Sequence, residues 1–302
     1  MFATLLGALP RPPLDPDAPE DALVDAALRV QEAAGLEPLT DGGLRGDVPT
    51  VEGWLATAAR TTGAVKQAVP GPYTAARAAG GTPSDIHAAT LVFAAEGNRL
   101  LRRLALEGCP LVEVHEPAAA AIADDEQRAL FREAHLRLLD GLDGTHPSLA
   151  LTGGNADAAG IDAILAAPYA SLAVDLIAGP DNWRLVALVP GDLGIVCGAL
   201  SVAADSYDGP ELLLWAAGYA ASMRGRGPDR VALATASSLA HLSWDAAVAK
   251  IERLGAAARL AVGPLDDRLA AFDPRAVSSR AAALGRVEGR PPQPSAEGDD
   301  PT

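Results

Sequence analysis

The sequence predicts an α/β fold and, within that class, a single (β/α)8 TIM barrel. Eight short apolar runs alternate along the chain with longer amphipathic or Ala-rich stretches, the order of strands and crossover helices. A doubly wound sheet normally uses only about five or six strands, and a barrel takes up about 250 residues, which the 302-residue chain can supply. We assign residues 1–285 to the barrel. Residues 286–302 are polar and rich in Pro and Gly, and we predict a disordered tail there.

The eight predicted strands are the apolar runs themselves. In chain order they are Thr4–Leu6, Leu36–Leu39, Ala64–Val69, Leu111–Val114, Ser148–Thr152, Leu172–Leu176, Gly194–Leu200 and Val231–Ala234. Three helices between them have clear start signals, a capping residue or proline followed by an acidic residue. These helices are predicted over Ala22–Ala34, from Thr82 to Glu107 and from Ser243 to Leu260.

The charge balance excludes several classes of partner. The chain has 24 Lys and Arg against 39 Asp and Glu, for a net charge of −15, so its surface repels phosphate backbones and we expect no nucleic-acid partner. No apolar run reaches the ~18–20 residues of a membrane span, and the first ten residues lack the basic start of a signal peptide. We expect a cytoplasmic protein with no membrane contact, acting on a small-molecule substrate. The oligomeric state stays open.

Cysteine usage and loop motifs limit the cofactors. Cys109 and Cys197 lie in apolar runs without CxxC spacing, which indicates buried free thiols rather than a disulfide or a local zinc site. The chain has no GxGxxG or Walker-type loop, so nucleotide cofactors are not expected.

In a barrel, functional side chains follow the carboxyl ends of the strands, and several polar residues of this chain stand there. The candidates are Arg11, Asp41, His115, Glu116, Asn155, Asp175 and Ser237. Asp175 is the one charge in an apolar run, so either an internal partner or a ligand must satisfy it. Glu116 either faces the barrel mouth or pairs with Arg11 or Arg45, and strand alternation separates it from its neighbour His115.

Four strings at successive strand ends resemble, in order, the catalytic barrel of cobalamin-independent methionine synthase and its uroporphyrinogen-decarboxylase-like relatives. TLLGALPRP (4–12) is similar to that family's T-x-x-G-S-x-P-R-P, and GLEPLTDGGLR (35–45) to its G-L-D-x-x-x-D-G-E-x-x-R. KQAVPGPYT (66–74) resembles K-x-x-x-x-G-P-x-T, and EVHEPA (113–118) resembles Q-I-D-E-P-A. The resemblance runs from about Thr4 to Leu260.

The resemblance also implies what this chain has lost. The family holds zinc, which activates the substrate thiol, with His-x-Cys, a Glu and a second Cys. The matching positions here are Ala150, Thr152, Asp175 and Ser237. The family's two carboxylates for the amino group of homocysteine are replaced by Gly43 and His115, and the polar residues after its seventh strand by Ser201 and Ala203. We therefore expect no metal and no zinc-dependent methylation of homocysteine.

The sequence thus predicts a divergent methyltransferase-like barrel that binds a small amino-acid or thiol-type substrate. We predict Glu116 and His115 as catalytic residues, and Arg11, Asp41, Asn155, Asp175 and Ser237 as substrate-binding residues. No cofactor is expected, since zinc lacks ligands and a folate methyl donor has no support in the sequence. The alternative is a non-catalytic binding or regulatory barrel derived from the same family, and whether the chain is an enzyme stays open.

Overall fold

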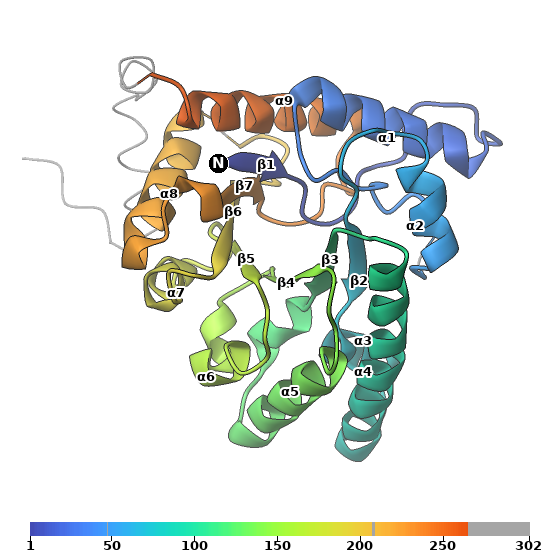
Figure 1. Ribbon diagram of the computed structural model, residues 1–302. Helices are drawn as coiled ribbons and strands as arrows, with labels where there is room; N and C mark the ends of the chain where they lie inside the picture. The colour runs from blue at the N-terminus through green and yellow to red at the C-terminus, as the bar shows by residue number, and fades with distance from the viewer. Residues whose placement is uncertain (47, 207–208, 265–302) are drawn as a thin grey trace, which may run out of the picture.

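The computed structural model describes residues 1–46, 48–206 and 209–264. It shows a mixed α/β fold in which a curled parallel sheet is surrounded by helices (Figure 1). The predicted tail at 286–302 lies outside the described residues, as does the last part of the barrel assigned to 265–285. Among the described helices, none combines the length and apolar character needed to cross a membrane.

The sheet has seven parallel strands in the order β1-β7-β6-β5-β4-β3-β2. From β2 to β7 each strand lies beside the next strand in the sequence, and β1 lies beside β7. The strands are β1 (Phe2–Thr4), β2 (Gln67–Pro70), β3 (Leu111–His115), β4 (His146–Leu151), β5 (Ser171–Asp175), β6 (Gly194–Leu200) and β7 (Val231–Thr235). Seven of the eight predicted runs form these strands, which confirms the α/β class and the parallel sheet. β1 and β2 are the two edges.

The remaining predicted strand, Leu36–Leu39, which is second in chain order, does not form a β-ladder. This corrects the prediction of eight hydrogen-bonded strands. It makes one isolated parallel bridge, between Leu39 and Val65. Glu37 N–H donates to the Ala3 carbonyl at 2.8 Å, and Leu39 N–H donates to the Ala64 carbonyl at 2.8 Å. Pro38 has no N–H to give to a ladder, so this segment bridges the two sheet edges with isolated hydrogen bonds.

Helices cover the outer face of the sheet (Figure 1). They are α1 (Glu20–Ala34), α2 (Val51–Ala58), α3 (Pro72–Ala79), α4 (Pro83–Leu106), α5 (Asp125–Leu138), α6 (Ile161–Ile164), α7 (Asn182–Leu188), α8 (Pro210–Ser222) and α9 (Trp244–Ala261). The three predicted helices correspond to α1, α4 and α9. Thr82 and Asp85 form a reciprocal capping box at the start of α4, and the Ser243 side chain caps α9.

The sheet separates two apolar regions. Large side chains such as Val112, Val114 and Phe131 fill the space between the sheet and the helices. The inner face carries a smaller cluster made of Leu6, Ala150, Ala173, Val196, Ala232 and Ala234. Because side chains alternate along β3, Val112 and Val114 face the helices while Glu113 and His115 share the opposite face.

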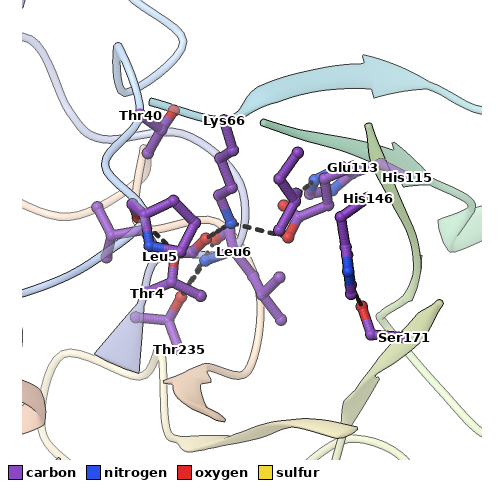
Figure 2. Close-up of polar contacts among 12 residues, drawn as sticks. Thr4, Leu5, Leu6, Thr40, Lys66, Glu113, His115, His146, Ser171 and Thr235 are labelled. Atoms are coloured by element: carbon purple, nitrogen blue, oxygen red, sulfur yellow. Dashed lines mark hydrogen bonds and ion pairs between the residues drawn. The ribbon is translucent and has the colours of Figure 1, made fainter. Parts of the chain in front are cut away.

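A buried lysine joins the two edges of the sheet. Lys66, just before β2, places its ammonium 2.5 Å from the Leu5 carbonyl beside β1 and 2.7 Å from Glu113 Oε2 on β3 (Figure 2). The side chains of Lys66 and Glu113 are 1% and 2% exposed. A charge at this depth is tolerated only when it is paired, so this contact is a strong constraint on how the sheet curls.

We predict that Lys66→Met destabilises the fold by about 3–5 kcal/mol, because it leaves the Glu113 carboxylate buried without its cation. Urea unfolding at neutral pH measures the change. Lys66→Met combined with Glu113→Leu should recover most of the loss, since neither charge then remains. Arg99→Met, which removes an exposed cation from α4, is the control and should stay within about 0.5 kcal/mol of the wild type. A loss below about 1 kcal/mol for Lys66→Met contradicts the prediction.

The same pair predicts a dependence of stability on acid. Burial alone would raise the pKa of Glu113, but the Lys66 charge and the His115 hydrogen bond lower this pKa from 4.5 to about 2. A depressed folded-state pKa stabilises the fold above pH 4.5, and this contribution is lost as the pH falls towards about 2. Unfolding free energies measured across this window should fall less steeply for the double variant than for the wild type. Equal slopes would show that Glu113 titrates normally.

Candidate functional site

A pocket of about 270 Å³ lies at the carboxyl ends of β1, β2 and β3. Gly7 and Ala8, which follow β1, form one wall, and the loop containing Asp41 and Arg45 forms another. The floor comes from β2 and from His115 at the end of β3. We call this the mouth pocket. Its volume suits a molecule of amino-acid size rather than a large cofactor.

His115 is held in the mouth pocket by a buried carboxylate. Its Nε2 lies 2.7 Å from Glu113 Oε1, while Glu113 Oε2 accepts from Lys66 (Figure 2). With its low pKa, Glu113 stays ionised at neutral pH and accepts a hydrogen bond from Nε2. The three side chains thus form a line from the interior of the sheet to the pocket, with the imidazole at its open end.

Glu113 and Lys66 are not among the site residues that the sequence predicts. The signal was present, because Glu113 lies in the predicted strand Leu111–Val114 and His115 follows it two positions later, so an extended chain puts both on one face. Lys66 belongs to the string that resembles the family motif, yet its partner is 47 positions away and its role needs the tertiary structure.

Glu116 lies away from the mouth pocket and serves the backbone. Its carboxylate accepts from Tyr73 N–H at 3.0 Å and from both the N–H and the hydroxyl of Thr74, at 2.8 and 2.6 Å. Its side chain is fully buried, and His135 Nε2 is 3.1 Å from Oε1. Tyr73 and Thr74 are in the first turn of α3, whose free N–H groups attract a carboxylate. Glu116 therefore holds α3 on β3, a geometry that does not support the predicted catalytic role.

Asp175 and Asn155 connect neighbouring strand-end loops. The Asp175 side chain, 2% exposed, accepts from the N–H groups of Gly153, Ile177 and Ala178 at 3.1, 2.9 and 2.8 Å. Asn155 exchanges two hydrogen bonds with Asp181, at 2.9 and 3.0 Å. Of the two alternatives for Asp175, the structure shows the internal partner, and that partner is backbone rather than a cation.

The other predicted substrate-binding residues are dispersed. Arg11 is exposed and donates to the carbonyls of Asp15 and Pro16 in its own loop, at 3.2 and 2.8 Å. Asp41 lines the mouth pocket and uses Oδ1 to accept from Gly43 N–H at 2.9 Å. Ser237 is half-buried after β7 and does not line that pocket. The structure thus brings His115 and Asp41 together and separates them from the rest.

The positions that the resemblance assigns to zinc do not fit the metal. Ala150 is fully buried in the inner apolar cluster, and Asp175 is engaged by three backbone N–H groups. Zinc needs about four nitrogen, sulfur or oxygen ligands. Across residues 1–46, 48–206 and 209–264, no group of three or more His, Cys, Asp and Glu side chains is arranged to hold a metal ion.

Gly43, which stands where the family has a glutamate, has a backbone conformation that a glutamate would not readily adopt. It has φ +69°, a left-handed conformation, and a Cβ built on it would lie 2.8 Å from Ala8 Cβ. A glutamate at this position would require both a change of backbone conformation and a shift of the loop after β1. The backbone at Gly43 is therefore incompatible with the glutamate that binds the amino group of homocysteine in the family.

Two groups of side chains outside the site are buried. Burial raises the pKa of Cys109 to about 11 and of Cys197 to about 12, so both are buried, unreactive thiols, as expected. His135 of α5 is 1% exposed, and its Nδ1 is 2.6 Å from the Tyr169 hydroxyl, so this histidine points inward.

Comparisons with known proteins agree with this geometry at the level of the fold. No family model matches the chain. It is 33% identical over 155 residues to a 5-methyltetrahydropteroyltriglutamate–homocysteine methyltransferase of Nitrobacter winogradskyi, a match that covers 48% of this chain and 19% of that protein. It is 31% identical over 208 residues to a protein of the same name from Rhodopseudomonas palustris, covering 62% of this chain and 25% of the relative.

Among solved structures, the chain is similar to a B12-independent methionine synthase from Shewanella sp. W3-18-1 in complex with selenomethionine. The TM-score is 0.72 at 16% sequence identity, and the match covers 89% of this chain and 99% of that one. The resemblance to cobalamin-independent methionine synthases is thus confirmed in sequence over part of the chain and in fold over most of it. The chain spans a quarter or less of the length of the relatives it matches in sequence.

We predict that Asp175→Asn lowers the free energy of unfolding by about 1–3 kcal/mol. The NH2 group of asparagine would face backbone N–H groups that now donate to the carboxylate, and two donors cannot form a hydrogen bond. Thermal and urea unfolding measure the loss. Asp181→Asn, a carboxylate change at the exposed partner of Asn155, is the control and should cost less. Unchanged or increased stability of Asp175→Asn would indicate a strained charge kept for a ligand, and would return Asp175 to the site.

Proposed function

We propose that this chain is a divergent, methionine-synthase-like barrel that binds a small amino-acid or thiol-type substrate in the mouth pocket. The carrying observation is that His115 lines this pocket and is held by an ionised Glu113. A buried carboxylate behind an imidazole fixes the tautomer and the orientation of the ring. This arrangement supports general acid–base catalysis by His115, at a position where the family has a carboxylate.

The proposal includes a closed barrel. The segment Leu36–Leu39 occupies the gap between β1 and β2, with hydrogen bonds to the backbone at both sides. Lys66 spans the same gap through the Leu5 carbonyl. These contacts support an eighth barrel position that is filled by irregular backbone, which would give the mouth pocket a continuous wall.

The residues of the mouth pocket have three different roles in the proposed function. His115 Nε2 carries the proton that it donates to Glu113, so Nδ1 is the nitrogen that exchanges a proton with the substrate. Asp41 offers Oδ2 to a donor on the substrate, since Oδ1 accepts from Gly43. Arg45 fixes the loop, because it donates to Asp21 and Thr57 at 2.6 and 2.7 Å.

This function runs without the family's metal. The side chains at the four zinc positions offer no fitting ligand set, so no step of the proposed reaction passes through zinc. An unactivated thiol has a pKa near 8.5 and is mostly protonated at neutral pH, and without zinc only a base can activate it. His115 is the candidate base in this pocket. A folate methyl donor stays without support.

We predict that a small thiol or amino acid stabilises the protein through the mouth pocket. Thermal shift and calorimetry with homocysteine, methionine and cysteine should identify a binder. His115→Gln should then weaken its binding at least about tenfold, equivalent to about 1.4 kcal/mol, because the ring contact is lost. His87→Gln, an exposed histidine on α4, is the control and should bind normally. Equal affinity in His115→Gln and the wild type would remove His115 from the site.

Turnover distinguishes an enzyme from a binding barrel. When a binder is known, its conversion is followed by NMR with the wild type and with His115→Gln. Loss of conversion in the variant supports the acid–base role. Tight binding with no conversion by the wild type supports the non-catalytic alternative.

We predict less than one equivalent of zinc in the untagged protein and no detectable methyl transfer from methyltetrahydrofolate to homocysteine. Elemental analysis and a methionine-formation assay measure both, and the gene should not rescue a methionine auxotroph. Chelation should leave the melting temperature unchanged, because no ligand set couples a metal to folding. Stoichiometric zinc that is lost together with activity on chelation would overturn the proposal.

A further inference from the structure

A second cavity, of about 420 Å³, opens at the opposite end of the sheet from the mouth pocket. Its wall includes the first residues of four adjacent strands, namely Leu111 of β3, His146 of β4, Ser171 of β5 and Gly194 of β6. Lys66 and Glu113 lie at its inner end. We call it the lower cavity. The barrel interior is therefore hollow from both ends, and the Lys66–Glu113 pair stands between the two spaces.

Small residues on neighbouring strands create the lower cavity. Ser148 of β4 pairs in register with Ser171 of β5, which pairs with Gly194 of β6. Barrel interiors are normally filled at each level by branched side chains such as Val, Ile and Leu. Two serines and a glycine leave this level unfilled. The space therefore follows from the sequence of three strands and not from a mobile loop.

The inner end of the lower cavity carries unused hydrogen-bonding groups. Ser148 is 1% exposed and belongs to the cavity lining, and its Oγ is buried without a hydrogen-bond partner. An ammonium has three N–H donors, and Lys66 uses two of them, on Leu5 and Glu113. Ser148 is the register neighbour of Glu113, the residue that accepts from Lys66, so the two unused groups belong to the same level of the sheet. A buried polar group without a partner is costly, which points to a missing ligand.

The charges around this end favour an uncharged ligand. Glu113 neutralises Lys66, and burial lowers the pKa of His146, so its ring is neutral at pH 7, 2.9 Å from Ser171 Oγ. The other charged lining residues are Asp192, Asp229 and Arg230, so a charged ligand of either sign would meet a like charge as well as an opposite one. Phe2, Leu111 and the inward-facing Val196 line the remaining wall with apolar surface.

We propose that the lower cavity is a second ligand site for a small uncharged molecule with an apolar body and one hydroxyl or carbonyl group. The oxygen of that group accepts from Lys66 Nζ and hydrogen-bonds Ser148 Oγ, and the apolar body packs against Phe2, Leu111 and Val196. The cavity volume is within the range of small-molecule sites. This site does not depend on the function proposed for the mouth pocket, because the two spaces have different walls.

Three probes that differ only in charge test this site. Benzyl alcohol carries the neutral hydroxyl, benzoate an anion and benzylamine a cation on the same ring. Amide chemical shifts of the ¹⁵N-labelled full chain are followed during titration with each probe. We expect benzyl alcohol to shift the amides of Ser148, Ser171 and Gly194, and to bind at least about fivefold more tightly than the two charged probes. A preference for a charged probe, or no binding of benzyl alcohol, overturns the proposal.

Ser148→Val is the decisive variant. Valine fills the space, removes the hydroxyl and suits a strand, so the fold should be at least as stable while benzyl alcohol binds at least tenfold more weakly. Thr152→Val, just beyond the carboxyl end of β4, is the matched control and should bind the probe as the wild type does. Ser171→Val, which narrows the cavity from the next strand, serves if Ser148→Val fails to fold. Unchanged binding in the folded variant would show that the probe lies elsewhere.

Discussion

The contact between Lys66 and Glu113 is the constraint on which the interior of this protein depends. A buried lysine and a buried glutamate each carry a large desolvation cost, and only their mutual contact and added hydrogen bonds offset it. Lys66 finds its second acceptor at Leu5, across the gap between the two edge strands. Glu113 finds its second donor at His115, at the mouth. One ion pair thus joins the sheet edges, orients the candidate base and separates the mouth pocket from the lower cavity.

The polar side chains at the strand ends divide into two groups with different roles. On β3 and β5, Glu116 and Asp175 accept from backbone N–H groups and fix the loops that follow. Their carboxylates are saturated by the protein, which leaves little capacity for a substrate. On the side of β1 and β2, Asp41 and His115 line an open pocket. The proposed chemistry therefore lies in the mouth pocket, where the loops contain several glycines and Arg45 fixes the loop that carries Asp41.

The fold is shared with methionine synthases more fully than the site is. The Shewanella enzyme matches most of this chain in space, while the zinc positions here are occupied by a core alanine and by side chains that offer no ligand set. Gly43 adopts a backbone conformation that a glutamate would strain. A parallel α/β fold tolerates such changes, because its stability comes from strands and helices and its chemistry from residues at the strand ends.

Seven of the strands, three of the helices and the family resemblance could be predicted from the sequence, because apolar period, capping residues and short motifs are local properties. The sequence also places His115 and Asp41 after apolar runs, and both line the mouth pocket. That Leu36–Leu39 bridges the sheet edges without joining the ladder depends on tertiary contacts, because Pro38 has no N–H and the N–H groups on either side of it find acceptors on different segments. The tertiary structure alone showed that Glu116 and Asp175 serve backbone N–H groups, which leave no trace in a side-chain pattern. The Lys66–Glu113 pair and the lower cavity arise from residues of different strands, and long-range packing alone brings such residues together.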